Sequence, residues 1–245
     1  MTSVVGVLCK DGVVLGTDSS ATLESGQVRT IEQPIQKLDV IGECVIVAGT
    51  GQIGLGQRFC AVVQQAWNNK EFQTTPIEVG KNLTKLAIKD FAETGAQRGQ
   101  YGALVAFPAE HKLCLCEFSV TDFQPEQKTE RLWYCSMGSA QPITDPFLAF
   151  IREVFWDTGL PTVQEAIFAV TWTLDHAISV NPGGVNGPAQ IAVLEHGRKT
   201  TLMARVLSEE ELGEHRQNIE AAKQLLRSLK LQHQPTNKTA TPPLP

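Results

Sequence analysis

Long hydrophobic runs are absent from this sequence of 245 residues. No segment approaches the roughly 18 consecutive apolar residues that a membrane-spanning helix requires. The first segment, MTSVVGVLCK, also has neither the basic region nor the apolar stretch of a secretory signal peptide. We therefore expect no membrane partner and a cytoplasmic location.

An excess of positive charge is also absent. The chain carries 21 Lys and Arg residues against 26 Asp and Glu residues, which gives a formal net charge of −5. Proteins that bind nucleic acid or anionic membranes usually present a basic surface, so neither partner is predicted. With 42% hydrophobic residues, the chain is long enough for one substantial core and leaves little room for a second domain.

Paired cysteines and clustered histidines are lacking as well. The six cysteines contain no CxxC pair, and the five histidines show no metal-ligand spacing. Cys114 and Cys116 lie two residues apart on one face of a strand-like segment and come nearest to a metal site. We expect reduced core cysteines, no disulfide framework, no metal and no other cofactor.

What the sequence does contain is an ordered series of strand-like and helix-like segments. Strands are indicated by β-branched and apolar clusters between turn residues, and helices by apolar residues at helical spacing. The predicted strands are 2–9, 13–18, 36–41, 44–51, 101–107, 112–119, 131–138, 190–196 and 200–206. The predicted helices are 52–70, 76–96, 143–156, 162–178 and 208–230. Asp11-Gly12 predicts a hairpin between the first two strands, and a polar loop is expected before the third.

This order favours two sheets sandwiched between helical layers over a βαβ alternation. Residues 207–231 are predicted to form a charged amphipathic C-terminal helix, which Ser208 and Glu211 begin as a capping box. Residues 232–245 are rich in Pro and Thr and poor in apolar residues, so a disordered tail is expected there.

Thr2 is a candidate nucleophile. A hydroxyl needs a base to take its proton, and the α-amine of the same residue can be that base once Met1 is removed. An α-amine has an ordinary pKa of about 7.7–8.0, so a useful fraction is neutral near pH 7. A nearby lysine cation would lower that pKa further. Small residues after an initiator Met are common, so the surrounding residues must decide.

The segments around Thr2 carry a more specific signal. TSVVGVLCKDGVVLGTDSSAT is followed by QKLDV, CVIVAGTGQ and MGSA. In order and content, these segments closely resemble the proteasome β-subunit type of N-terminal-nucleophile (Ntn) hydrolase, a threonine peptidase family. The resemblance implies an α+β fold, a four-layer αββα sandwich with two antiparallel sheets, which we assign to residues 1–206.

The resemblance also implies a catalytic group. Thr2 would be the nucleophile, Asp18 would orient a lysine, and Lys37 would be that lysine. Gly51 matches the glycine whose backbone N–H stabilises the oxyanion, and Ser139 matches a supporting serine. Peptide bonds are the implied target of this group.

Two departures from the family pattern leave questions open. Ser179 matches a helper serine, but His176 stands where the family often has its helper aspartate, and Asp175 lies one residue away. The segment between Asp18 and Lys37 is about three residues longer than usual, so it must bulge if the lysine is to reach the nucleophile.

Positions that match the family's specificity pocket are all uncharged: Ala21, Ile35, Gly49 and Ile53. They predict a preference for an apolar or large neutral substrate side chain. The family further implies peptide or unfolded-protein substrates, self-association into rings around an enclosed chamber, and an ATP-dependent unfoldase as partner.

Three other interpretations stay open. Gly49, Gly51 and Gly54 form a literal GxGxxG between a strand and a helix, which is typical of dinucleotide binding. No parallel strand ending in an acidic residue follows about 20 positions later, as that motif requires. A catalytically silent scaffold subunit would share the fold, and a non-peptidase Ntn amidohydrolase would share the nucleophile.

Overall fold

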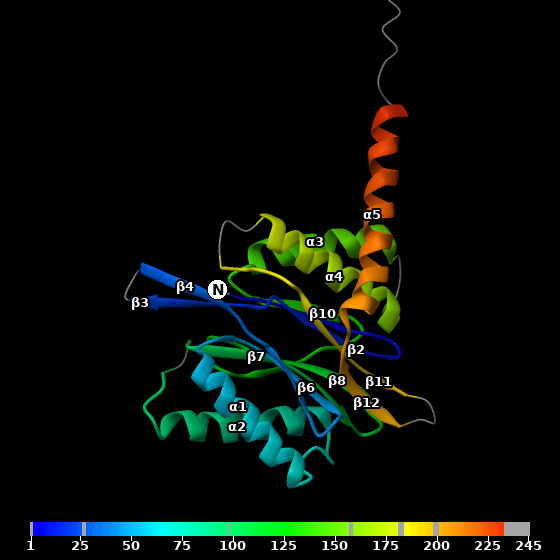
Figure 1. The fold of residues 1–245 in the computed structure, drawn as a ribbon. Helices are drawn as coiled ribbons and strands as arrows, with labels where there is room; N and C mark the ends of the chain where they lie inside the picture. The colour runs from blue at the N-terminus through cyan, green and yellow to red at the C-terminus, as the bar shows by residue number, and fades with distance from the viewer. Residues whose placement is uncertain are drawn as a thin grey trace, which may run out of the picture.

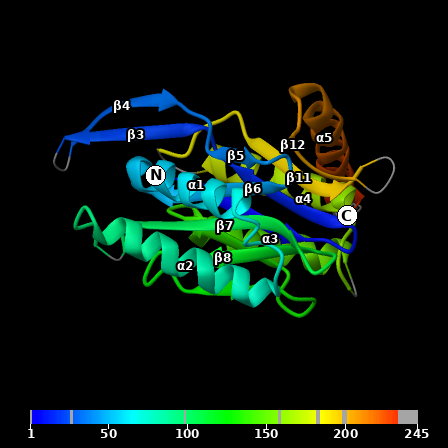
Figure 2. The same cartoon turned by 90° about the horizontal axis from the view of Figure 1, so that it is seen from below.

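The computed structural model describes residues 2–25, 28–97, 99–156, 159–180, 184–197 and 201–232. Within these ranges the chain forms two antiparallel sheets packed face to face, with helices on both outer faces (Figures 1 and 2). The predicted four-layer αββα sandwich is therefore confirmed. The predicted disordered tail lies outside the described residues, except that Gln232 is the last residue of the final helix.

The first sheet carries the N-terminal strand near its middle. Its strands, in spatial order, are β10 (Tyr134–Gly138), β1 (Ser3–Leu8), β2 (Gly12–Thr17), β11 (Gln190–His196) and β12 (Leu202–Val206). β1 and β2 pair antiparallel across the predicted Asp11-Gly12 turn. Thr2 therefore sits at the very start of a strand that has neighbours on both sides.

The second sheet carries the strand that follows Lys37. Its strands, in spatial order, are β5 (Leu38–Ile41), β6 (Val45–Gly51), β7 (Tyr101–Ala109), β8 (Lys112–Phe118) and β9 (Pro125–Gln127). β6 pairs antiparallel with β5 on one side and with β7 on the other. A dinucleotide-binding βαβ unit needs parallel strands on either side of its glycine-rich turn, so this topology excludes that interpretation of the GxGxxG segment.

The helices cover the two outer faces in pairs. They are α1 (Ile53–Asn68), α2 (Pro76–Ala92), α3 (Gln141–Phe155), α4 (Val163–Val180) and α5 (Glu209–Gln232). In Figure 1, α1 and α2 lie below the second sheet, and α3 and α4 lie above the first. α5 packs on α4 and then extends beyond the body of the molecule. In the described part of the chain, none of these helices is both long and apolar enough to cross a membrane.

The alternation of side chains along the strands explains the layers. Ile46 and Ala48 of β6 face the core between the two sheets, whereas Val45 and Val47 face the core under α1 and α2. Successive strand residues point to opposite faces, so a strand covered on both sides needs apolar residues throughout. This explains the nearly continuous apolar segments in the sequence.

Two segments differ from expectation: the short strand β9 was not predicted, and the larger difference lies before the third predicted strand. The segment predicted as a polar loop before the third strand forms a hairpin of its own, β3 (Ser20–Ser25) and β4 (Val28–Pro34). The hairpin extends outward from the sandwich near the N-terminus (Figures 1 and 2). A register shift at Leu23 and Glu24 interrupts its ladder. The additional length between Asp18 and Lys37 is thus taken up in a paired arm.

Candidate active site

Thr2 lies beside the ammonium group of Lys37. The Nζ atom of Lys37 is 3.4 Å from the Oγ1 atom of Thr2 and donates a hydrogen bond to it. Thr2 precedes β1 of the first sheet and Lys37 precedes β5 of the second, so the two sheets must pack together to form this contact. The structure therefore places a positively charged hydrogen-bond donor against the hydroxyl of the predicted nucleophile.

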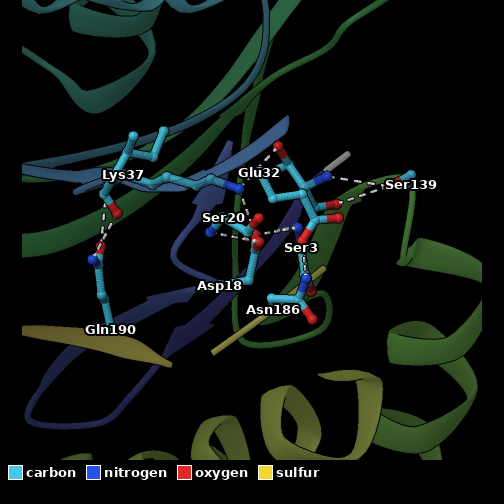
Figure 3. A network of polar contacts seen from close by, with 10 residues as sticks. Ser3, Asp18, Ser20, Glu32, Lys37, Ser139, Asn186 and Gln190 are labelled. Carbon is cyan, nitrogen blue, oxygen red and sulfur yellow. Dashed lines mark hydrogen bonds and ion pairs between the residues drawn. The ribbon is translucent and has the colours of Figure 1, made fainter. Parts of the chain in front are cut away.

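Asp18 holds the side chain of Lys37 through an ion pair. Its Oδ1 atom lies 2.8 Å from Nζ of Lys37 and also accepts a bond of 2.9 Å from the backbone N–H of Ser3. Its Oδ2 atom accepts a bond of 3.2 Å from the backbone N–H of Ser20 (Figure 3). The carboxylate is completely buried, and three donors compensate for its removal from water.

The backbone of Lys37 is fixed separately from its side chain. Gln190, the first residue of β11, accepts a hydrogen bond of 2.9 Å from the Lys37 N–H through Oε1. Its Nε2 atom donates to the carbonyl oxygen of Ile35 at 2.9 Å. One amide side chain thus holds both sides of the turn into β5 (Figure 3). Gln190 lies 153 positions after Lys37 in the sequence, so no local sequence pattern could predict this contact.

Burial lowers the pKa of Lys37 below that of a free lysine, while the charge of Asp18 and its hydrogen bond act in the opposite direction. Burial disfavours the charged form of an amine because the protein solvates it less well than water does. The paired carboxylate therefore keeps a cation in a place where an isolated lysine would lose its proton more easily.

Ser139 holds Thr2 from the other side. The backbone nitrogen of Thr2 donates to Oγ of Ser139 at 3.1 Å, and this Oγ also lies 3.4 Å from the carbonyl oxygen of Thr2 (Figure 3). Because Met1 precedes Thr2 in the chain, the nitrogen here is an amide, and it stands in for the α-amine of a processed chain. As an amide it cannot act as a base.

Gly138 and Gly51 owe their place to backbone geometry. Gly138 has φ +95°, and a Cβ there would overlap the carbonyl oxygen of Thr2. Gly51 has φ +112°, and a Cβ there would overlap the carbonyl oxygen of Gln100. Both conformations are ones that L side chains rarely adopt. The sequence analysis named Gly51 but assigned no role to Gly138, although Gly138 lies within the MGSA segment that contains Ser139.

A pocket of about 470 Å³ opens at Thr2. Gly51 lines it, and so do three of the four residues predicted to set specificity, Ile35, Gly49 and Ile53. The fourth, Ala21, is buried in β3 and is not part of the lining. The lining also contains polar residues that were not predicted, Asp39, Gln57, Cys60 and Tyr101 among them.

The predicted helper serine is engaged elsewhere. The hydroxyl of Ser179 donates to the carbonyl oxygen of His176 in its own helix at 2.8 Å. The ring of His176 stacks on Phe147 at 4.3 Å between centroids, and Asp175 pairs with Arg216 of α5 at 3.4 Å. Among the described contacts, none joins these three residues to Thr2. Similarly, no group of three or more His, Cys, Asp or Glu side chains in the described ranges converges as metal ligands would.

The sandwich of two antiparallel sheets between helical layers, with Thr2 at the start of the first strand, is the proteasome β-like, Ntn-type fold. The chain belongs to the proteasome subunit family, whose model matches residues 1–148. Among curated proteins, none gives a significant match.

Solved structures share this fold over the whole chain. Anbu (ancestral beta-subunit) from Yersinia bercovieri is 15% identical, with a TM-score of 0.68, and the match covers 100% of this chain and 99% of that one. The Anbu (Gly-1) mutant from Hyphomicrobium sp. strain MC1 is 13% identical, with a TM-score of 0.71, covering 97% and 100%. A helical assembly of the Anbu complex from Pseudomonas aeruginosa is 14% identical, with a TM-score of 0.67, covering 99% and 98%.

Proposed function

We propose that this chain is a threonine-type endopeptidase in which Thr2, exposed by removal of Met1, is the nucleophile. The observation that supports it most directly is the line of contacts from Asp18 through Lys37 to the Thr2 hydroxyl. A structural ion pair would need only two partners. Here the ammonium group is aimed at a third, which is a hydroxyl at the start of a strand and at the mouth of a pocket.

The proposed reaction begins when the neutral α-amine of processed Thr2 takes the proton of its own hydroxyl. Oγ1 attacks the carbonyl carbon of the substrate, and the backbone N–H of Gly51 stabilises the oxyanion that forms. The α-amine then passes the proton to the leaving amine as the C–N bond breaks. Water later hydrolyses the ester on Oγ1, which regenerates the hydroxyl. The cation of Lys37 favours the deprotonated hydroxyl and lowers the pKa of the α-amine.

The proposed substrates are peptides or unfolded protein segments, because an extended chain can reach a nucleophile that lies at the end of a strand and lines an open pocket. The proposed assembly is a multi-subunit ring around an enclosed chamber, with an ATP-dependent unfoldase as partner. The Anbu complex from Pseudomonas aeruginosa is a helical assembly, which supports self-association of this fold in general.

Thr2→Ala and Thr2→Ser test the assignment together. We expect Thr2→Ala to lose cleavage of short fluorogenic peptides and to resist labelling by a peptide epoxyketone. Thr2→Ser should keep measurable activity, because it retains a hydroxyl beside the free amine. Mass spectrometry of the N-terminus must show first that Met1 has been removed.

Each rival function makes a different forecast for the same proteins. A silent scaffold subunit would give no labelling at all in the processed wild type. A non-peptidase amidohydrolase would be labelled at Thr2 but would cut no peptide of any sequence. Undiminished peptide cleavage by Thr2→Ala would reject the proposed nucleophile.

A further inference from the structure

The pocket beside Thr2 has two walls of different origin. One wall is a single face of α1, formed by Ile53, Gly56, Gln57 and Cys60, which recur at the i, i+3, i+4, i+7 spacing of one helix face. The other wall comes from the β5–β6 pair, which contacts α1 (Figure 2). The pocket therefore runs between a helix and a sheet face, away from the Thr2 hydroxyl.

Asp39 supplies the acidic group of the sheet wall. It follows Lys37 by two positions, and alternate residues of a strand point to the same side. Leu38, between them, is completely buried in the core, whereas both neighbours line the pocket. The face of the chain that carries the ammonium group of Lys37 thus also carries the carboxylate of Asp39, two residues later.

The charge of this carboxylate is not compensated within the described residues. Its Oδ2 atom accepts a hydrogen bond of 3.3 Å from the thiol of Cys60, and none of the described ion pairs includes it. Burial, together with the charge of Asp39, raises the pKa of Cys60, so this thiol stays a neutral donor. The described lining also contains one basic residue, Lys37, but its ammonium group pairs with the carboxylate of Asp18 and not with that of Asp39.

The remaining lining carries no charge and is kept open by glycine. A Cβ at Gly49 would overlap the hydroxyl of Tyr101. Burial raises the pKa of Tyr101 well above its ordinary value, so its phenol is neutral at physiological pH. Beyond Lys37, a long side chain that enters from Thr2 therefore passes neutral walls and meets one anion.

We propose that this pocket selects a basic residue, arginine or lysine, on the acyl side of the cleaved bond, with Asp39 as its partner. The inference rests on the proposed function, because it takes the pocket as the place of the side chain whose carbonyl Thr2 attacks. It replaces the neutral preference that Ala21, Ile35, Gly49 and Ile53 alone suggested. Asp39 is exposed to solvent in this chain. Exposed ion pairs contribute about 0.2–1 kcal/mol, so we expect a discrimination of up to about fivefold.

Binding to an inactive variant tests the pocket apart from the chemistry. We would measure the affinity of assembled Thr2→Ala protein for fluorescent peptides that end in arginine or in citrulline, its neutral near-isostere. We expect the arginine peptide to bind about three- to fivefold more tightly. Adding Asp39→Asn should remove the difference, whereas adding Glu153→Gln, which removes an exposed carboxylate on α3, should leave it unchanged.

Equal affinity for the two peptides, no binding of either, or a preference that survives Asp39→Asn would overturn the proposal. The first two results are also expected if a cation of a neighbouring subunit fills the pocket in the assembly. A clear preference for arginine, together with a processed wild type whose Thr2 no epoxyketone labels, would support Asp39 as the partner of a basic side chain and reject the proposed peptidase function. Turnover of arginine over leucine peptides by active protein, reversed in favour of glutamate by Asp39→Lys, would extend the result to catalysis.

Discussion

The ammonium group of Lys37 lies between the carboxylate of Asp18 and the hydroxyl of Thr2. Its proposed role requires the protonated, positively charged form. On the proposed mechanism, the α-amine of Thr2 must be neutral and Lys37 must be charged, so activity rises with pH and then falls. The rise follows the α-amine, whose ordinary pKa is about 7.7–8.0. The fall follows Lys37, whose pKa is lowered by burial.

We expect the alkaline limb of the kcat/KM profile to lie below the ordinary lysine value of 10.5. Lys37→Arg keeps the positive charge to far higher pH, because the pKa of arginine is above 12. It should therefore lower activity through altered geometry but move the alkaline limb upward and leave the acid limb in place. An alkaline limb that is the same in both proteins would assign it to another group.

Gly138 provides a second prediction at this scale. Gly138→Ala should reduce peptide cleavage by about tenfold or more, because a Cβ would push the carbonyl of Thr2 and a small displacement of a nucleophile is costly. The strained φ should also lower the free energy of unfolding by about 1–3 kcal/mol. Gly54→Ala is the matched control, since a Cβ there meets no atom within 4 Å. Normal activity in Gly138→Ala would show that Thr2 does not depend on this contact.

The residues around Thr2 differ in how far the sequence could predict them. Thr2, Asp18 and Lys37 lie in short segments whose order could be matched to a family, and the structure brings them together. Gln190 could not be found, because its contact with Lys37 depends on how β11 of the first sheet packs against β5 of the second. Asp39 was missed for another reason: only the packing of β5 against α1 reveals that its side chain lines a pocket.

Elements were predicted well where a periodic apolar pattern was strong. The helix predicted at 76–96 is observed as Pro76–Ala92, and its first turn is capped by Thr75, which accepts from the N–H of Glu78. The β3–β4 hairpin was mistaken for a loop because its segment is polar and the last four residues of β4, 31–34, are exposed. Apolar periodicity reports burial, so a two-stranded arm outside the core escapes it.

The predicted capping box of α5 is present and yields a stability prediction. Oγ of Ser208 accepts from the N–H of Glu211 at 3.3 Å, and Oε2 of Glu211 accepts from the N–H of Ser208 at 2.9 Å. Ser208→Ala should cost about 1 kcal/mol of unfolding free energy, as loss of a helix cap usually does. Peptide cleavage should be unchanged, because α5 lies away from the Thr2 pocket.

Ser228→Ala is the control for that measurement. Ser228 lies in the exposed part of α5, and its hydroxyl donates to the carbonyl of Leu225 within the helix. Its replacement by alanine, the best helix former, should leave stability the same or slightly higher. Equal losses of stability in chemical denaturation for both variants would mean that the box contributes nothing specific.

At the scale of the whole molecule, the surface suggests contact with other copies. Large apolar side chains are exposed on α3 and on the distal part of α5, namely Phe150, Val154, Phe155, Leu225, Leu226 and Leu229. Exposed apolar patches often mark protein interfaces. We expect the protein to elute as an assembly many times heavier than the 26.7 kDa chain.

Light scattering after size exclusion would give the mass, and electron microscopy would show whether the assembly is a closed ring or a helix. A closed ring would support the enclosed chamber that we propose, and a helical form would resemble the Pseudomonas aeruginosa assembly. A stable monomer across the micromolar range would contradict the proposed self-association.

The position of Asp18 also sets an order in time. Its carboxylate joins the N–H groups of Ser3 and Ser20 to the ammonium of Lys37, and so connects the two sheets at the point where Thr2 emerges. Until both sheets have formed and docked, a newly synthesised chain carries a threonine but nothing that positions a cation beside it. If Thr2 is the nucleophile, the active site is complete only at the end of folding. A partly folded subunit therefore cannot cleave the proteins around it.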